Sequence, residues 1–169
     1  MKKIIFVLVI ISLFSCKKEV LPYSDEFEKS EQLWNTYKNS IDNSYSYITY
    51  SGSVFGGHSE TQITVQNGKV TGRFFISGVY QQNASQLVIK ETWTEDLATL
   101  NTHINGAKSL TLDEIYRKAS KEWLNVDTKT NDIYFSTDTM GFIASCGYVA
   151  KGCQDDCFTG VYIKAITKL

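Results

Sequence analysis

This sequence of 169 residues contains one proline, two histidines and two methionines, and its 17 basic and 18 acidic residues nearly cancel in charge. The absence of a basic surplus or a basic stripe argues against a nucleic-acid partner. Beyond residue 15, no apolar run approaches the about 20 residues that a membrane-spanning helix requires. The sequence has no Gly-x-Ser-x-Gly elbow, His-Glu-x-x-His helix or phosphate-binding glycine loop, so no familiar motif predicts an enzyme.

The chain begins with a leader of the kind that directs export. Lys2 and Lys3 precede an apolar run over residues 4–14, in which Ser12 is the one polar residue. A charged start, a short apolar stretch and a small residue at the break are typical of a secretory signal peptide. The run is too short to span a bilayer, and we expect residues 1–15 to be removed.

The leader ends in Leu13-Phe14-Ser15-Cys16, which resembles the lipobox of bacterial lipoproteins. The resemblance implies that Cys16 receives a diacylglycerol, becomes the first mature residue and is acylated at its amine. Several acyl chains anchor stably because each buried methylene contributes about 0.8 kcal/mol. Lys17 stands where an aspartate would resemble a signal for the inner membrane, so we expect lipid anchoring in the bacterial outer membrane. Lys17-Lys18-Glu19 is similar to a Bacteroidota surface signal, and both the periplasmic and the surface-facing side stay open.

The rest of the chain divides into a tether and one domain. Residues 16–25 carry no apolar periodicity and are interpreted as a lipidated tether, and residues 26–169 are enough for a single folded domain. Ten tyrosines and nine phenylalanines, together with turns marked by Gly, Asn and Ser, favour strands.

The first half of the domain is predicted to form a helix followed by strands. Apolar residues recur at helical spacing in its first segment, and Ser24 or Asp25 could cap that helix. The period then changes to two. Asn67-Gly68 between alternating segments is a strong hairpin signal because both residues tolerate a positive φ. The expected elements are a helix at about 25–41 and strands at about 44–49, 61–66, 69–76 and 86–93.

The second half repeats this order. Thr111 and Glu114 have the spacing of a capping box, and Leu112, Ile115 and Ala119 after Thr111 share one helical face. The order helix–strands–helix–strands favours an α+β fold, an antiparallel sheet with two helices packed on one face. The expected elements are a helix at about 111–124 and the strands "DIYFST", "GFIASCGYV" and "FTGVYIKAI".

Several short motifs follow one another along the mature chain: a helical tryptophan, a tyrosine-rich strand, an Asn-Gly hairpin, a Thr-x-Asp-Glu helix, a glycine–aromatic turn and an acidic pair. They lie at Trp34, Tyr45, Tyr47, Val65–Val70, Thr111–Glu114, Gly141-Phe142 and Asp155-Asp156. This series resembles the family of small secreted bacterial proteins known as domain of unknown function 6174. The resemblance implies a shared fold, and the family has no assigned activity. Ile143 stands where the family often has proline.

Three cysteines remain after the anchor: Cys146, Cys153 and Cys157. Cysteines exposed to an oxidising compartment form disulfides, and three of them allow three pairings. If residues 142–148 pair with residues 158–166, Cys146 and Cys157 become diagonal neighbours within bridging distance. We therefore favour Cys146–Cys157, with Cys153–Cys157 as the rival.

Candidate binding residues are few, and each has a simpler structural interpretation. His58 with Glu60 could form an acid–base pair or a ligand set, but a surface-turn histidine is commoner. Asp155-Asp156 could bind calcium, or zinc together with the cysteines, although the spacing fits no standard site and a solvated loop tip is commoner. We expect no metal and no cofactor. Aromatic residues dense enough to bind a peptide or glycan, half of which must face the core by alternation, are Tyr45, Tyr47, Tyr50, Phe74, Phe75 and Tyr80.

These features together favour a lipid-anchored envelope protein that is non-catalytic and binds or scaffolds another envelope protein or a glycan. One alternative is an envelope enzyme or inhibitor that acts through the Cys146–Cys157 loop. Another is a small-ligand carrier that uses the open face of the sheet.

Overall fold

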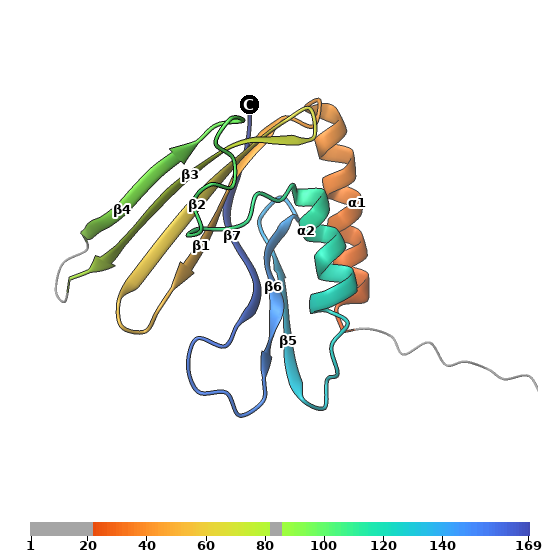
Figure 1. The fold of residues 1–169 in the computed structure, drawn as a ribbon. Helices are drawn as coiled ribbons and strands as arrows, with labels where there is room; N and C mark the ends of the chain where they lie inside the picture. Colours follow the sequence, from red (N-terminus) through yellow and green to blue (C-terminus); the bar gives the residue numbers. More distant parts are fainter. Residues whose placement is uncertain (1–21, 82–85) are drawn as a thin grey trace, which may run out of the picture.

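The computed structural model describes residues 22–81 and 86–169 (Figure 1). The predicted signal peptide and Cys16 lie outside these residues. Residues 24 and 25 of the predicted tether already belong to the first helix. The elements are α1 (Ser24–Ser40), β1 (Tyr45–Gly52), β2 (Gly57–Gln66), β3 (Lys69–Tyr80), β4 (Leu87–Glu95), α2 (Leu112–Lys118), the π-helical turn η1 (Ala119–Trp123), β5 (Asn131–Thr137), β6 (Ile143–Ala150) and β7 (Thr159–Lys168).

The strands form one antiparallel sheet, which makes the fold α+β as predicted. The strand order is β4-β3-β2-β1-β7-β6-β5, so the last strand of the chain lies between β1 and β6 (Figure 1). Residues 163–168 of β7 pair with β1, and residues 159–162 pair with β6. β7 is thus the strand that joins the two parts of the sheet.

The Asn67-Gly68 hairpin is confirmed. Asn67 has φ 49° and Gly68 has φ 74°, and Gln66 pairs with Lys69 across the turn. The arms are longer than alternation alone predicted, because β2 begins at Gly57 and β3 ends at Tyr80. His58, expected in a surface turn, is therefore a strand residue.

The two helices begin differently. Thr111 and Glu114 form the predicted capping box, in which each side chain binds the other residue's backbone N–H. The prediction that Ser24 or Asp25 caps α1 is wrong. The N-cap is Tyr23, which has a left-handed backbone and no capping side chain. Its ring packs instead against Phe135 of β5 at 6.2 Å between centroids, so a tertiary contact fixes the start of α1.

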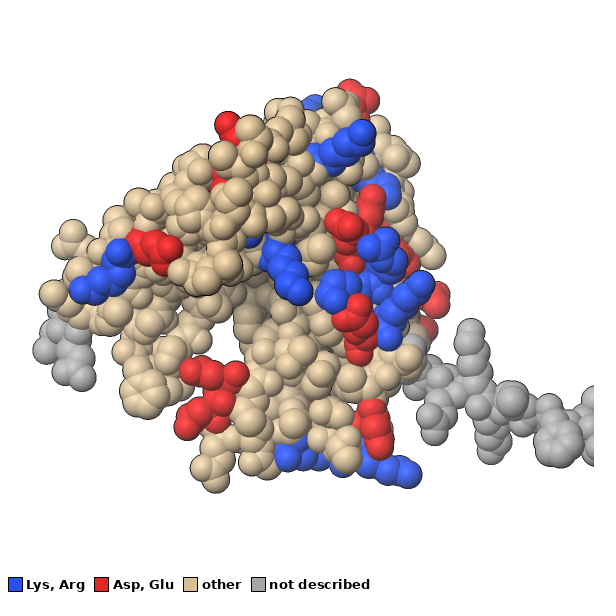
Figure 2. Space-filling model, in the orientation of Figure 1, with Lys and Arg blue, Asp and Glu red and all other residues tan. Residues whose placement is uncertain are grey.

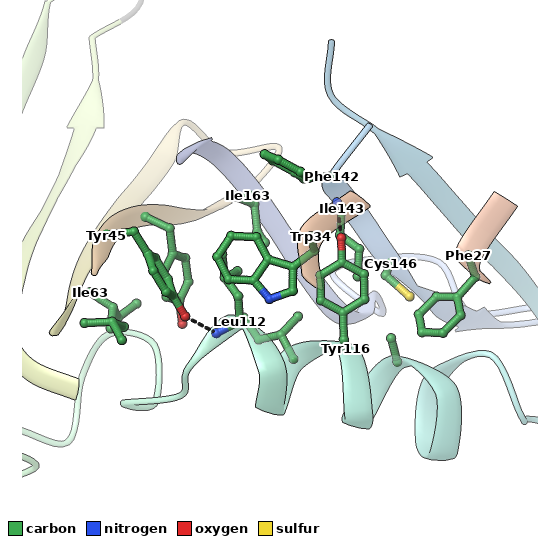
Figure 3. Packing of buried hydrophobic residues seen from close by; sticks show 14 of the residues in the cluster. Phe27, Trp34, Tyr45, Ile63, Leu112, Tyr116, Phe142, Ile143, Cys146 and Ile163 are labelled. Carbon is green, nitrogen blue, oxygen red and sulfur yellow. Dashed lines mark hydrogen bonds between the residues drawn. The ribbon is translucent and has the colours of Figure 1, made fainter. Parts of the chain in front are cut away.

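The core is built largely from aromatic side chains, and those around Trp34 have their polar atoms hydrogen-bonded. Trp34 of α1 meets Tyr45 edge to face at 4.9 Å and Phe142 at 5.7 Å (Figure 3). Its indole N–H donates to Asp113 at 2.8 Å, and the Leu112 N–H donates to the Tyr45 hydroxyl at 2.9 Å. Large apolar area is thereby buried without leaving these polar atoms unpaired.

Tyr116 of α2 ties three elements together. Its hydroxyl lies 2.8 Å from the Ser30 Oγ of α1 and accepts a hydrogen bond from the Ile143 N–H of β6 at 3.2 Å (Figure 3). Burial raises the pKa of Tyr116 to about 12, so the phenol stays protonated. It can then act as donor and acceptor at once.

A buried ion pair between β3 and β4 orders the long loop that follows β4. The Arg73 guanidinium donates to Glu95 at 2.7 and 2.9 Å, and the two side chains are 3% and 0% exposed. Arg73 also donates to the carbonyls of His103 and Ala107. Glu95 accepts from the N–H groups of Asn101 and His103 at 2.8 and 2.7 Å. Polar contacts thus hold a loop that has no regular secondary structure.

We predict that Glu95→Gln destabilises the protein and weakens its response to acid. The hydrogen bond from Arg73, reinforced by backbone N–H groups against the cost of burial, holds the pKa of Glu95 well below its ordinary value. A depressed pKa stabilises the fold fully above the unfolded value of about 4.3, and this stabilisation is lost as the pH falls toward the folded value. The substitution leaves Arg73 buried without a counter-charge, so the free energy of unfolding at pH 7 should fall by about 3–5 kcal/mol.

Urea unfolding of both proteins between pH 7 and pH 3 measures these effects. Glu122→Gln is the matched control, because Glu122 forms an exposed pair with Lys118 and should contribute less than about 1 kcal/mol. Equal losses for the two variants, or an unchanged acid response in Glu95→Gln, would contradict the role given to the buried pair.

Candidate functional site

The sheet opens between β1 and β7, where the two strands stop pairing. Residues 45–49 of β1 pair with β7, and the register shifts between Ile48 and Thr49. Beyond that point, residues 50–52 pair with β2 alone and residues 159–162 pair with β6 alone, within the part of the chain that the structure describes. The diverging edges bound a cleft of about 1080 Å³, and the molecule is visibly hollowed between the two parts of the sheet (Figure 2).

Short polar side chains cover the wall formed by β1, β2 and β3. The hydroxyls of Ser51 and Ser59 face each other across the two strands at 2.8 Å. The Thr61 hydroxyl accepts from the Ala107 N–H at 2.9 Å, so the loop fixed by Arg73 and Glu95 reaches the inner end of the cleft. Gly52 adds no side chain. This wall leaves its backbone open to a ligand.

The disulfide loop forms the opposite wall. Cys153 is bonded to Cys157, with their Cα atoms 6.2 Å apart, and Cys146 is free and buried. The favoured Cys146–Cys157 pairing is therefore wrong, and the rival pairing is present. Cys146 lies opposite Val161 and points into the core, whereas Cys157 precedes β7 in an exposed loop. The alternation of β6 thus separates the two sulfur atoms.

Asp155 and Asp156 lie at the exposed tip of this loop, between the bonded cysteines, and both line the cleft. Neither carboxylate forms an ion pair with any side chain that the structure describes. Within residues 22–81 and 86–169, no group of three or more His, Cys, Asp or Glu side chains is arranged to hold a metal ion. The pair contributes two unpaired negative charges at the rim.

A row of stacked rings crosses the sheet beside the cleft. Phe158 stacks on Tyr162 at 4.3 Å, and Tyr162 stacks on Tyr50 at 5.4 Å, so the contact bridges β7 and β1 where they diverge. Tyr50 continues to His58 of β2 at 6.5 Å, and His58 continues to Tyr80 of β3 at 5.5 Å. We call these five side chains the aromatic row.

His58 and Glu60 contact each other as the sequence suggested, and Lys164 of β7 joins them. Glu60 Oε1 lies 3.0 Å from His58 Nε2 and 2.6 Å from Lys164 Nζ. Burial raises the pKa of Glu60, but hydrogen bonds from Lys164 and His58 outweigh it and keep the pKa below its ordinary value. Glu60 is thus a weak proton acceptor, and its clearest role is to link β2 to β7.

Alternation divides the predicted aromatic residues evenly between the two faces. Tyr45, Tyr47 and Phe75 are buried, while Tyr50, Tyr80 and Phe74 are exposed. Burial raises the pKa of Tyr45 and Tyr47, and their hydroxyls bond the backbone of Leu112 and Leu110. Tyr45 and Tyr47, the two proposed binding tyrosines, thus face the core, and Tyr50 on the same strand is the one beside the cleft.

The sequence did not single out Phe158 and Tyr162. Both belong to the segment "FTGVY", in which alternation could have assigned them to one face. Their meeting with Tyr50 depends on the pairing of β1 with β7, which are more than a hundred residues apart in the chain. No local sequence pattern predicts that contact.

We predict that the native protein contains no reactive thiol once the anchor cysteine is removed. In a Cys16→Ala background, native iodoacetamide treatment at pH 8 should label no cysteine. Burial raises the pKa of Cys146 to about 12 and shields its sulfur, and the other two cysteines are bonded. Guanidinium should then expose one thiol, and guanidinium with reductant should expose all three.

Peptide mapping by mass spectrometry identifies the labelled residue. The two candidate pairings give different results, because a Cys146–Cys157 bond would leave the exposed Cys153 free. Native labelling of Cys153 would therefore overturn the observed pairing.

No helix in the described residues is long and apolar enough to cross a membrane. No family model, curated protein or solved structure matches the chain.

Proposed function

We propose that this protein is a lipid-anchored, non-catalytic domain of the bacterial outer membrane, which binds another envelope component in the cleft between β1 and β7. The cleft carries the proposal, because strand edges without a partner strand line both of its sides and Asp155 and Asp156, which form no ion pair among the described side chains, lie at its rim. The cleft volume of about 1080 Å³ is comparable to that of ligand sites in proteins, which typically occupy about 300–1,000 Å³. The lipobox at Cys16 supports the location, and the partner would be an envelope protein or a glycan.

The fold would leave this site accessible. We infer that α1 and α2 cover one face of the sheet in the order helix–strands–helix–strands. Side chains of both helices join the cluster formed by Tyr45 and Ile63, which supports this arrangement. The aromatic row, in which Tyr50 and Tyr80 are exposed, lies on the other face by alternation. The resemblance to domain of unknown function 6174 supports the fold and implies no activity.

The histidine contacts favour binding over catalysis. His58 contacts Glu60, and His103 contacts the buried Glu95 that already pairs with Arg73. No serine, threonine or cysteine among the described residues is hydrogen-bonded to either histidine, so neither has the nucleophile–base pairing of covalent catalysis. The alternatives, an enzyme or inhibitor acting through the cysteine loop and a small-ligand carrier, are distinguished by the experiments below.

We predict that Cys16→Ala releases the protein from membranes. Without the thiol there is no acceptor for the diacylglycerol, and no helix among the described residues is long and apolar enough to span the bilayer in its place. Membrane fractionation and mass analysis of the mature amino terminus measure the effect. Cys153→Ala combined with Cys157→Ala is the control and should stay on the membrane. A Cys16→Ala protein that still sediments with membranes would contradict the anchor.

We predict that a photo-reactive benzoylphenylalanine at Ser51 captures the partner in cells. Ser51 is exposed and lines the cleft, whereas Glu28 is exposed on α1 and serves as the control position. Illumination should give one defined adduct from position 51 and none from position 28. A protein adduct, a polysaccharide adduct and a small-molecule adduct identify the three ligand classes. No adduct from position 51, together with turnover of a defined substrate, would replace the proposal with an enzyme.

A further inference from the structure

Two strand edges face the cleft from opposite sides, and both have free backbone groups. Residues 50–52 of β1 pair with β2 on one side, and residues 160–162 of β7 pair with β6 on one side. Along the described residues neither edge has a strand on its cleft side, and both edges line the cleft. An unpaired strand edge is a template for another extended chain.

At the β1 edge, Ser51 and Gly52 are small enough for a backbone to approach. A Cβ added at Gly52 would meet only the Gly57 carbonyl, at 3.7 Å, which is ordinary van der Waals contact. Ser51 already directs its hydroxyl to Ser59. Main-chain hydrogen bonds to an added strand are therefore sterically open along β1.

We propose that an extended peptide segment of an envelope protein binds in this cleft as an added strand, through main-chain hydrogen bonds to one of the two edges. The inference rests on the proposed binding function and names its ligand class. Strand addition derives affinity from the main chain and specificity from alternate side chains. The aromatic row would contact the apolar side chains of such a segment.

The rim charge indicates which side chains the segment carries. Asp155 and Asp156 are exposed at the loop tip beside the cleft and lack an ion-pair partner among the described side chains. The disulfide loop that carries them forms the wall of the cleft opposite β1. A lysine or arginine in the bound segment would complement this pair, so the ligand is a segment with alternating apolar residues and at least one basic residue.

The geometry of the aromatic row argues for a peptide over a glycan. A sugar ring binds aromatic side chains by lying flat on a free ring face. Phe158 and Tyr162 stack at an interplanar angle of 22°, and Tyr50 stacks on Tyr162 at 28°. Tyr162 stacks on both Phe158 and Tyr50, and Tyr50 stacks on both Tyr162 and His58, so these two rings offer little free face to a sugar.

Selection from a phage-displayed library of random 12-residue peptides tests this inference, with the full chain in detergent micelles as bait. Enriched peptides should alternate apolar residues and share a basic residue. Synthetic copies should slow amide hydrogen exchange, measured by mass spectrometry, in residues 50–53 or 160–162. N-methylation of alternate peptide amides should weaken binding about tenfold for the set that faces the edge and little for the other set, since only the first set donates main-chain hydrogen bonds to the protein.

A charge substitution tests the rim separately. Asp155→Asn with Asp156→Asn should weaken binding of the basic peptides about three- to tenfold at low salt. Glu26→Gln with Glu28→Gln removes two exposed carboxylates from α1 and should leave affinity unchanged. Circular dichroism checks that both variants fold.

Failure of the inference is distinguishable from failure of the proposed function. If no peptide is enriched, if exchange slows elsewhere, or if the two N-methylated sets bind alike, strand addition is wrong. An envelope polysaccharide captured at Ser51 in cells would then leave the binding function standing with a different ligand. If no peptide is enriched and no adduct forms at Ser51, both the strand-addition inference and the proposed binding function are wrong.

Discussion

The structure depends on the change of partner along β7. Its first half pairs with β6 and its second half pairs with β1, so the two parts of the sheet must diverge around one continuous strand. Close approach of β6 and β7 makes this possible. A Cβ at Gly160 would lie 2.1 Å from the Cys146 carbonyl oxygen, and one at Gly147 would lie 2.4 Å from that of Thr159. Any side chain at either glycine would push the strands apart and deform the cleft.

The cleft also depends on polar contacts made far from it. Arg73 and Glu95 bind the loop after β4 through its own backbone, and Ala107 of that loop donates to Thr61 at the inner end of the cleft. Burying a charge pair is costly unless its remaining donors and acceptors are satisfied. Here the loop carbonyls and N–H groups satisfy them. The pair therefore helps to shape a cleft that it does not line.

Local features of this fold were readable from the sequence, and long-range features were not. Asn67-Gly68 and the Thr111 capping box were correct because each depends on backbone angles and contacts within a few residues. The cysteine pairing failed because it required the β6–β7 register and the side to which Cys146 points. The ion pair of Arg73 with Glu95 joins residues of two strands and produces no periodic pattern in the sequence. Tyr50 lay in the predicted aromatic set, but its neighbour Tyr162 arrives from the other end of the chain.

The proposed anchor and the proposed site together restrict the partner. Ser24, where α1 begins, is eight residue steps after Cys16, and an extended chain spans at most about 3.5 Å per residue. The start of α1 would therefore stay within about 28 Å of the lipid surface. Figure 1 shows α1 at one side of the fold, and no residue of α1 lines the cleft. A ligand would thus be met at a surface that α1 does not form, near the membrane that holds the proposed anchor. This geometry favours an extended segment of a neighbouring envelope protein over a segment of a freely diffusing protein.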